Sequence, residues 1–448
     1  MFKKQKGNVL ANAVFLLFAV TATAACADKQ STEVLDGNAS DATVIGWMQG
    51  FPPAKDKRIT QPDSNFFSFP KLRWSVCHMQ ELLPTATIKR DPYAYRPLPY
   101  KLLSSIDDVA FMPLDSQTSM TWKQSLSVNY TDGLLILHNG HIVYEYYSGC
   151  LTPHTLHAAM SMTKSITGLL AEILIAEKYL DEQQNVSEVV PELAGSAFAD
   201  ATVRQVMDMT TSLDYSENYA DPQADIWKYS YAANPLPKPA DYQGPIGYYE
   251  YLQTVRKKDQ HGQIFGYKTV NSDVLGWILS RVTGLSYQQL VSRYLWQRVG
   301  TEHDGLVTVD GLGTAFAGGG ISATLRDLAR IGQLMLQQGR IDGVQLIPAQ
   351  AIQSIQQGGD KSAFAKSGYT SLPNASYKSM WWVFHNKHGA YAARGVHGQT
   401  IYIDQFADMV IVRLASHPSA GNAANDPTSL PAYQAVAEHL IKQGTQDK

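Results

Sequence analysis

The sequence predicts an α/β protein of the α+β type, in which an antiparallel sheet is flanked by helices and lies beside a largely helical region. Two observations predict it. The clearest strand pairs of the 448-residue chain lie far apart, near residues 134–146 and 400–416. Helical patterns fill much of the sequence between them. Strands at both ends of a domain imply that the first and last strands meet in one antiparallel sheet.

The first strand pair surrounds a turn dipeptide. An apolar run from Leu134 to Leu137 precedes Asn139-Gly140, and an alternating segment from Ile142 to Tyr146 follows. Asn-Gly tolerates the positive φ angles of a two-residue hairpin. Near the C-terminus, "TIYIDQFADMVIVRLAS" predicts two more strands joined by a short turn.

Helices are predicted between these strands. Around 161–179 the apolar residues recur at helical spacing, and they are Ile166, Leu169, Leu170, Ile173 and Leu174. Further helices are predicted at 202–211, 271–283 and 324–338. Thr324, with Asp327 three residues later, is a suitable capping pair for the last of these.

Composition narrows the class of partner. Hydrophobic residues at 44% and charged residues at 17% are inconsistent with a largely disordered chain. A formal net charge of -3 gives no electrostatic reason to expect nucleic acid, so a small molecule is the expected partner. His154 and His157 lack a nearby Cys, Asp or Glu at ligand spacing, and no metal or cofactor is predicted.

The first 26 residues have the layout of a secretory signal. Three lysines precede an apolar run from Val9 to Val20, and small residues follow up to Ala25. The rival interpretation, a transmembrane anchor, is disfavoured because the run is shorter than the roughly 20 residues that cross a bilayer, and Asn12 interrupts it. We therefore expect an exported protein, either periplasmic or secreted.

The cysteines leave two questions open. Cys26 directly follows "TATAA", as in bacterial lipoproteins whose cysteine is lipidated and anchored to the membrane, but Thr23 stands where such sites usually carry leucine. Ordinary cleavage after Ala24 or Ala25 is the alternative. Cys77 and Cys150 either pair in an oxidising compartment or remain separate buried thiols.

Three further parts are predicted after residue 26. Residues 27–63 are polar and lack periodicity, which indicates a flexible tail or linker. Residues 64–120 are rich in aromatics and prolines and suggest an extension packed on the main body. The main domain then covers 121–448, with a helical insertion at about 180–300.

Ser161 and Lys164 are the first candidate catalytic pair. A serine hydroxyl needs a base to attack a carbonyl, and a lysine three residues along a helix lies beside it. Partial burial would lower the pKa of that lysine. The pattern alone is weak evidence, because Ser68 and Lys71 have the same spacing in a proline-containing stretch.

Two later segments strengthen the evidence that Ser161 and Lys164 are catalytic. "FGYKTVNSDVLGW" places Tyr267 just before a predicted helix, with Thr269 close behind, and "ARGVHGQTIYID" brings a glycine-rich turn to a strand. With "SMTKS" and "FAGGGISATLRDLARIGQLML", these segments stand in the order found in the serine β-lactamase-like hydrolases. Over roughly residues 65–440 the chain resembles that family, and within it the branch of 6-aminohexanoate-dimer (nylon-oligomer) hydrolases and related esterases.

The resemblance implies a β-lactamase/transpeptidase-like fold and three catalytic roles. Ser161 would be the acylated nucleophile, Lys164 its proton-transfer partner, and Tyr267 the phenol that protonates the leaving group. Tyr267 could act as a base only if a cationic neighbour lowered its pKa, and Lys164 is the obvious neighbour.

The same resemblance implies an oxyanion hole made of two backbone N–H groups, one of them from Ser161. The sequence leaves the second open among the residues that follow Gly395, namely Val396, His397, Gly398 and Gln399.

Substrate contacts are expected from the loop "DYSENYADPQADIWKY" and from residues near Tyr267. Tyr219 is the candidate in the loop, by analogy with related amide hydrolases, although Tyr215 stands only four residues away. Thr269 follows the second motif, and Trp381 and Trp382 either wall the pocket or pack in the core.

Two departures argue against β-lactam hydrolysis. The third motif lacks the Lys-Thr-Gly of penicillin-recognising enzymes and offers Arg394, His397 and Gln399, and the second reads Tyr-Lys-Thr where β-lactamases usually place Asn. The leading interpretation is an exported hydrolase of small esters or amides. A D,D-peptidase or β-lactamase is the alternative. A non-catalytic ligand-binding relative is disfavoured, since it would have no chemical need for all three catalytic residues.

Overall fold

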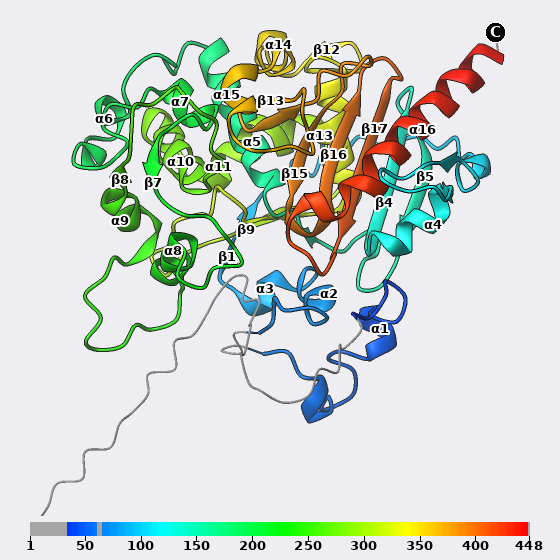
Figure 1. Cartoon of the computed structure of the whole chain (residues 1–448), viewed down its shortest axis with the longest axis horizontal. Helices are drawn as coiled ribbons and strands as arrows, with labels where there is room; N and C mark the ends of the chain where they lie inside the picture. Colours follow the sequence, from blue (N-terminus) through cyan, green and yellow to red (C-terminus); the bar gives the residue numbers. More distant parts are fainter. Residues whose placement is uncertain (1–33, 61–64, 447–448) are drawn as a thin grey trace, which may run out of the picture.

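A seven-stranded antiparallel sheet forms the centre of the computed structural model, which describes residues 34–60 and 65–446 (Figure 1). Its strands, in spatial order, are β13 (Ser376–Lys378), β14 (Trp381–Val383), β15 (Tyr391–Gly395), β16 (Gln399–Asp404), β17 (Met409–Ala415), β4 (Thr131–His138) and β5 (His141–Tyr147). β17 pairs with β4. The first and last predicted strand pairs therefore meet in one sheet, as the sequence predicts.

Local sequence explains the β4–β5 hairpin. Asn139 and Gly140 adopt φ angles of 50° and 76°, which the two central residues of a tight hairpin turn require. The predicted hairpin is confirmed, and so is the C-terminal strand pair, β16 and β17.

Most of the α-helices lie in the sequence between these strand pairs, and the others lie before or after it. They are α1 (Ala42–Ile45), α2 (Leu72–Ser75), α3 (Met79–Leu82), α4 (Trp122–Val128), α5 (Met162–Ala176), α6 (Val186–Val189), α7 (Val203–Met207), α8 (Asp225–Ala233), α9 (Gly247–Thr254), α10 (Val270–Thr283), α11 (Tyr287–Val291), α12 (Gln297–Val299), α13 (Leu325–Leu336), α14 (Ala349–Gln357), α15 (Lys361–Ala365) and α16 (Asp426–Gln446). α5, α10 and α13 confirm three of the four predicted helices, and α7 covers only the first half of the helix predicted at 202–211. The Asp327 N–H donates to Thr324 Oγ1 over 3.2 Å, so the predicted cap is present.

Helices cover both faces of the large sheet. Along β4, Leu135 and Leu137 join one apolar core, whereas Leu134 and Ile136 join the other, as the two-residue period of a strand requires. α5 and α13 supply the first core, and α4 and α16 supply the second. Figure 1 shows the helices from α6 to α11 gathered to one side of the sheet.

A second, smaller sheet has the strand order β1 (Thr85–Ile88), β9 (Gly305–Thr308), β10 (Ile321–Ala323) and β6 (His157–Ala158). Three two-stranded pairs complete the strands of the described residues: β2 (Ala110–Phe111) with β3 (Met120–Thr121), β7 (Leu213–Asp214) with β8 (Arg256–Lys257), and β11 (Arg340–Ile341) with β12 (Val344–Gln345). β6 leads directly toward α5, so this sheet anchors the chain just before Ser161.

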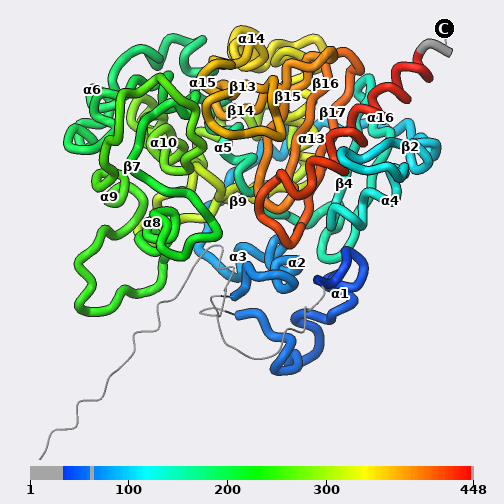
Figure 2. Tube along the Cα trace, viewed as in Figure 1, coloured from blue at the N-terminus to red at the C-terminus, as the bar shows by residue number. Residues whose placement is uncertain are grey.

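The N-terminal segment, here residues 34–60 and 65–120, packs on the main body (Figure 2). Residues 34–60, for which the sequence suggested a flexible tail, contain α1 and bury Ala42 and Ile59. Further along, the Ala158 N–H donates to the Val76 carbonyl over 2.8 Å. Cys77 and Cys150 form a disulfide, which decides the pairing that the sequence left open.

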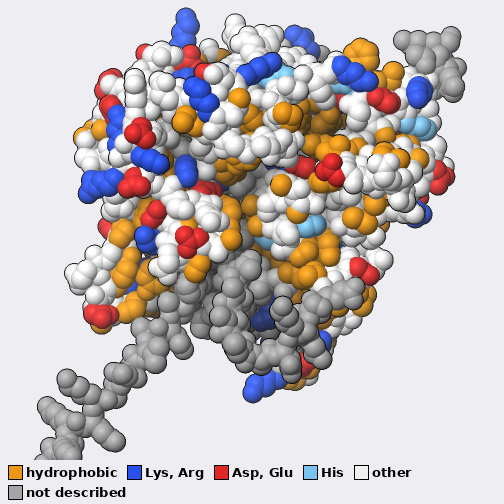
Figure 3. All heavy atoms as spheres, viewed as in Figure 1, with side chains coloured by type: hydrophobic (Ala, Val, Ile, Leu, Met, Phe, Trp, Pro, Cys, Tyr) orange, Lys and Arg blue, Asp and Glu red, His pale blue; other side chains and the backbone are white. Residues whose placement is uncertain are grey.

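Charge is mixed on the face in Figure 3, where Lys and Arg side chains alternate with Asp and Glu. Within 34–60 and 65–446, none of the helices is long and apolar enough to cross a membrane. The predicted signal at 1–26 and its Cys26 lie outside the described residues.

Candidate active site

Ser161 lies at the N-terminus of α5, where the chain turns from β6 into the helix. The residue before it, Met160, has a φ of 49°, a conformation that costs a side-chain-bearing residue about 1–3 kcal/mol. Opposite this turn is Gly395, at the end of β15. A Cβ on Gly395 would lie 2.9 Å from the Ala159 carbonyl oxygen, so a glycine is needed for the close approach of strand and turn.

Lys164 lies one helical turn after Ser161 and is 1% exposed. Its Nζ is 3.0 Å from Ser161 Oγ and 2.5 Å from the Gly318 carbonyl oxygen. Burial lowers the pKa of Lys164, because the ammonium form loses its hydration, while the negative charges of Glu217 and Asp273 partly oppose this effect. The amine is therefore easier to deprotonate than an exposed lysine.

Tyr267 completes the group around the serine. Its phenol forms a hydrogen bond with the Ser161 side chain, and its ring centroid is 5.2 Å from Lys164 Nζ. Burial raises the pKa of Tyr267 well above the ordinary value, and the hydrogen bond to Ser161 only partly offsets it. The condition for a base role, a pKa lowered by a neighbouring cation, is not met, and the resting phenol is protonated.

Glu217 is a member of the site that the sequence analysis missed. Its carboxylate accepts hydrogen bonds from the Tyr219 hydroxyl at 2.6 Å, from Thr269 Oγ1 at 2.6 Å and from the Thr269 N–H. It thereby connects the predicted substrate loop to the second motif. Its position two residues before Tyr219 was the available signal, but a single carboxylate in a polar loop carries no distinctive pattern.

The structure separates the two tyrosines of that loop. Tyr219 lines the cleft beside Ser161. Tyr215 lines a separate cavity between α8 and α9, together with Trp227 and Tyr251. Of the two candidates, Tyr219 is therefore the one that can reach a substrate bound at Ser161.

The third motif has Arg394, Gly395 and Val396 at the cleft, and the residues that follow are engaged in the fold. Val396 lines the cleft with Ser161. The His397 N–H donates to the Ala420 carbonyl oxygen over 3.0 Å, so this donor is already used. Gly398, with a φ of 97°, forms the turn into β16.

The side chains of this motif are also used structurally. His397 Nδ1 lies 2.6 Å from the His417 carbonyl oxygen, and burial lowers the pKa of His397 to about 4. Gln399 Oε1 accepts the Ala415 N–H at 3.0 Å, which ties β16 to β17. Neither side chain lines the cleft at Ser161.

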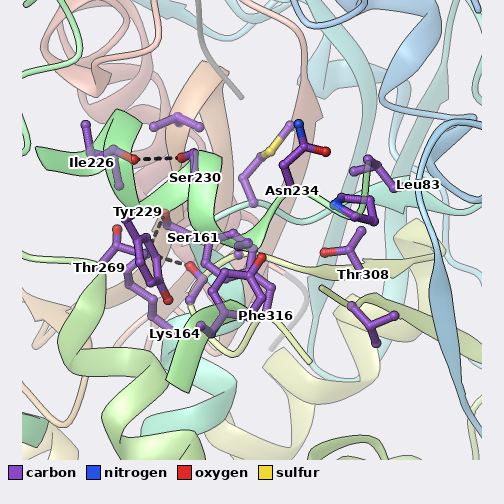
Figure 4. Close-up of a pocket in the computed structure, with 18 of the residues that line it drawn as sticks. Leu83, Ser161, Lys164, Ile226, Tyr229, Ser230, Asn234, Thr269, Thr308 and Phe316 are labelled. Atoms are coloured by element: carbon purple, nitrogen blue, oxygen red, sulfur yellow. Dashed lines mark hydrogen bonds between the residues drawn. The ribbon is translucent and has the colours of Figure 1, made fainter. Parts of the chain in front are cut away.

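The cleft has two halves that share Tyr219 and Val396. One half, shown in Figure 4, contains Ser161 and Lys164 and is enclosed largely by α8 and by the chain around 308–319. The other half is lined by Glu217, Tyr267, Tyr369, Trp382 and Arg394, with the chain around 420–423.

The two tryptophans of β14 have different roles. The Trp382 ring packs on the Tyr267 ring at a centroid distance of 5.7 Å and lines the cleft. Trp381 is fully buried, and its Nε1–H donates to the Ser165 carbonyl oxygen over 2.8 Å. Trp382 therefore walls the pocket, and Trp381 belongs to the core.

The histidines near the serine lie apart from the reacting atoms. His157 is buried between the Ala158 carbonyl oxygen and the Asp132 carboxylate, at 3.0 and 3.3 Å. His154 contacts His303 at the surface. Within the part of the chain that the structure describes, no three His, Cys, Asp or Glu side chains are grouped as a metal site requires.

Comparison with known proteins shows which family the chain resembles. Residues 130–433 match the family model "Beta-lactamase". The chain is 38% identical over 352 residues to the 6-aminohexanoate-dimer hydrolase of Paenarthrobacter ureafaciens, covering 78% of this chain and 86% of that protein.

Solved structures extend the comparison. A candidate 6-aminohexanoate-dimer hydrolase from Bacillus anthracis has a TM-score of 0.78 at 30% identity, covering 88% of this chain and 99% of that one. A class C β-lactamase from Rhodobacter sphaeroides, with a TM-score of 0.50 at 15% identity over 70% of this chain and 97% of that one, shares the fold. This chain is a member of the β-lactamase family of serine hydrolases and a relative of the 6-aminohexanoate-dimer hydrolases.

Proposed function

We propose that the protein hydrolyses small amides and esters through an acyl-enzyme on Ser161. The observation that carries the proposal is the convergence of a buried lysine amine and a protonated phenol on one serine hydroxyl. The 38% identity to a 6-aminohexanoate-dimer hydrolase supports an amide substrate.

Each proton has a donor and an acceptor in this scheme. Neutral Lys164 takes the hydroxyl proton as Ser161 Oγ bonds to the carbonyl carbon, and Tyr267 gives its proton to the departing nitrogen or oxygen. Lys164 then returns a proton to Tyr267. In deacylation Lys164 accepts a proton from water and passes it to Ser161 Oγ as the acyl bond breaks.

The tetrahedral intermediate needs two N–H donors for its oxyanion. We assign these to the backbone of Ser161 and Val396. The support is that both residues line the cleft, whereas the His397 N–H is bonded to Ala420.

Fluorophosphonate labelling tests the nucleophile. The unmodified protein should be labelled, and Ser161→Ala should not. Ser68→Ala is the matched control, because Ser68 has the same spacing to a lysine, yet its Oγ donates to the Asn65 carbonyl oxygen. Labelling that persisted in Ser161→Ala, or vanished in Ser68→Ala, would reject the assignment.

We expect weak or no β-lactamase activity. The Arg394 guanidinium is paired with the buried Asp426 carboxylate, so it is a poor replacement for the lysine that meets a β-lactam carboxylate. Purified protein should hydrolyse nitrocefin far more slowly than a short-chain nitrophenyl ester. Efficient nitrocefin turnover would instead favour the β-lactamase or D,D-peptidase alternative.

We also propose export of the protein. The charged-then-apolar layout of residues 1–26 supports it, and a Cys77–Cys150 disulfide suits an oxidising compartment. Cell fractionation with radiolabelled palmitate tests both parts. Label lost in Cys26→Ser supports lipidation, unlabelled exported protein rejects it, and cytoplasmic full-length protein rejects export.

A further inference from the structure

We propose that the half of the cleft shown in Figure 4, here called the acyl pocket, receives the acyl group of the substrate and selects an uncharged, apolar one. Its walls include Ile226, Tyr229, Ala233, Tyr248, Val309 and Phe316. The proposal rests on the function proposed above, because it assumes that Ser161 is acylated.

The position of Tyr267 decides which half holds which part of the substrate. Tyr267 lines the other half of the cleft, beside Trp382 and Arg394. A phenol that protonates the leaving group must touch it, so the leaving group occupies that half. The acyl group, bonded to Ser161, is left with the acyl pocket.

The walls of the acyl pocket are apolar and aromatic. The Tyr248 and Phe316 rings stack with centroids 5.2 Å apart, and the Tyr229 ring packs against Tyr248 at the same distance. Ile226 and Val309 add aliphatic surface. Such a lining favours the transfer of a hydrocarbon chain from water.

The polar side chains of this pocket are partly used by the backbone. Ser230 Oγ donates to the Ile226 carbonyl oxygen over 2.8 Å, as the dashed line in Figure 4 shows. Asn234 Oδ1 accepts the Leu236 N–H at 2.9 Å. Both side chains are therefore partly engaged before a substrate binds.

A charge in the acyl pocket would find no partner. Among the described residues that line it, Lys164 is the one charged side chain, and burial favours its neutral form. A terminal ammonium or carboxylate on the acyl group would be desolvated without an ion pair, which is costly. The carboxylate Glu217 and the cation Arg394 both line the other half.

An aromatic cage for a cation is the rival interpretation of the same walls. Aromatic faces attract ammonium groups by cation–π interaction, and Tyr229, Tyr248 and Phe316 offer such faces. That interpretation predicts the opposite order of substrates, so one experiment separates the two.

The test uses three nitrophenyl esters with acyl groups of equal chain length: hexanoate, 6-aminohexanoate and the monoester of adipate. With the uncatalysed rates subtracted, kcat/KM for hexanoate should exceed each of the others by about tenfold or more, the cost of an unpaired charge. Equal or higher kcat/KM for 6-aminohexanoate would overturn the proposal and favour the cage, and a preference for adipate would overturn it as well.

A matched pair of variants tests whether the preference for an uncharged acyl group arises in the acyl pocket. Asn234→Asp keeps the Oδ1 acceptor for Leu236 and replaces the amide nitrogen of this pocket-lining residue with a charged oxygen. It should raise the ratio of 6-aminohexanoate to hexanoate turnover by about tenfold. Asn139→Asp adds the same charge at the β4–β5 turn and should leave the ratio unchanged.

The outcomes also separate this proposal from the proposed function. Equal turnover of all three esters, or an unchanged ratio in folded Asn234→Asp, overturns the acyl pocket while hydrolysis at Ser161 stands. Absence of turnover with all three esters, together with unlabelled Ser161, rejects both. The ester series on the unmodified protein decides the question by itself if Asn234→Asp does not fold.

Discussion

Lys164 sets the expected pH dependence of the reaction. In the proposed mechanism its deprotonated form is the reactive one, and burial lowers its pKa, so kcat/KM for a neutral ester should rise with pH to a plateau. The midpoint should lie below about 10.4, the ordinary lysine value, and activity should be lost as the pH falls through it.

Lys164→Arg tests this dependence. A guanidinium stays protonated, so kcat/KM should fall by about 10²–10⁴. Lys71→Arg, in the look-alike pair with Ser68, is the matched control and should keep full activity. If the fall of kcat/KM at low pH were unchanged in Lys164→Arg, a group other than Lys164 would be responsible for it.

Asp273 should raise the pKa of Lys164. It is fully buried on α10, its Oδ1 accepts the Gly318 N–H at 3.3 Å, and the Gly318 carbonyl accepts from Lys164. Burial raises the pKa of Asp273 above its ordinary value, and once ionised its negative charge stabilises the ammonium form and so raises the pKa of Lys164. Asp273→Asn keeps the oxygen acceptor but removes the charge, so the acidic limb should move to lower pH.

Stopped-flow or plate assays of kcat/KM against pH would measure this shift. Asp310→Asn provides a comparison, because Asp310 also accepts backbone N–H groups in a buried turn. A profile of Asp273→Asn that moved to higher pH, or moved equally in Asp310→Asn, would contradict the electrostatic explanation.

Ser161, Lys164 and Tyr267 were predictable because they stand in several sequence motifs that occur together in the order of a known family. The spacing of Ser161 and Lys164 alone was weak evidence, since Ser68 and Lys71 share it. Glu217, Asp273 and the Gly318 carbonyl act through contacts made by distant segments. The residue types of Glu217 and Asp273 do not reveal these contacts. The Gly318 carbonyl cannot be singled out from the sequence, because every residue has a backbone carbonyl.

At the scale of elements, α5 must lie close to the edge of the large sheet. A Cβ on Gly168, in the middle of α5, would lie 1.9 Å from the Ser379 carbonyl oxygen. Gly168→Ala should therefore destabilise the protein by about 1–3 kcal/mol, and it should lower activity because the same helix holds Ser161 and Lys164.

Thermal or denaturant unfolding would measure the change. Gly444→Ala in α16 is the control, because a Cβ there meets nothing within 4 Å. Alanine is the better helix former by about 0.5–1 kcal/mol, so this variant should be neutral or slightly stabilised. Equal stability of the two variants would mean that α5 moves freely away from Ser379.

Elements with strong periodicity or turn chemistry were predictable. The Asn139-Gly140 hairpin and the Thr324 cap are examples. The strands of the small sheet were not, because β6 and β10 have two and three residues. So short a strand shows no alternation, and only its tertiary partners define it.

At the scale of the whole molecule, the N-terminal segment is tied to the main body by the Cys77–Cys150 disulfide. The same segment supplies Leu83 to the acyl pocket. A disulfide that closes a long loop typically contributes about 2–4 kcal/mol. Dithiothreitol should therefore lower the melting temperature and reduce activity.

The double variant Cys77→Ser, Cys150→Ser is the control for this prediction. It should melt at the temperature of the reduced protein and should not respond to dithiothreitol. A melting temperature of the unmodified protein that was insensitive to reduction would show that packing alone holds the segment.

The antiparallel pairing of β17 with β4 has a consequence for biosynthesis. Ser161 and Lys164 emerge from the ribosome early, but the strand wall opposite them, β15, and the Asp426 that pairs with Arg394 come much later. A nascent chain can therefore carry the proposed nucleophile before the proposed oxyanion hole has formed. The newly made protein should therefore not hydrolyse amides or esters until the last strands have been translated and have joined the sheet.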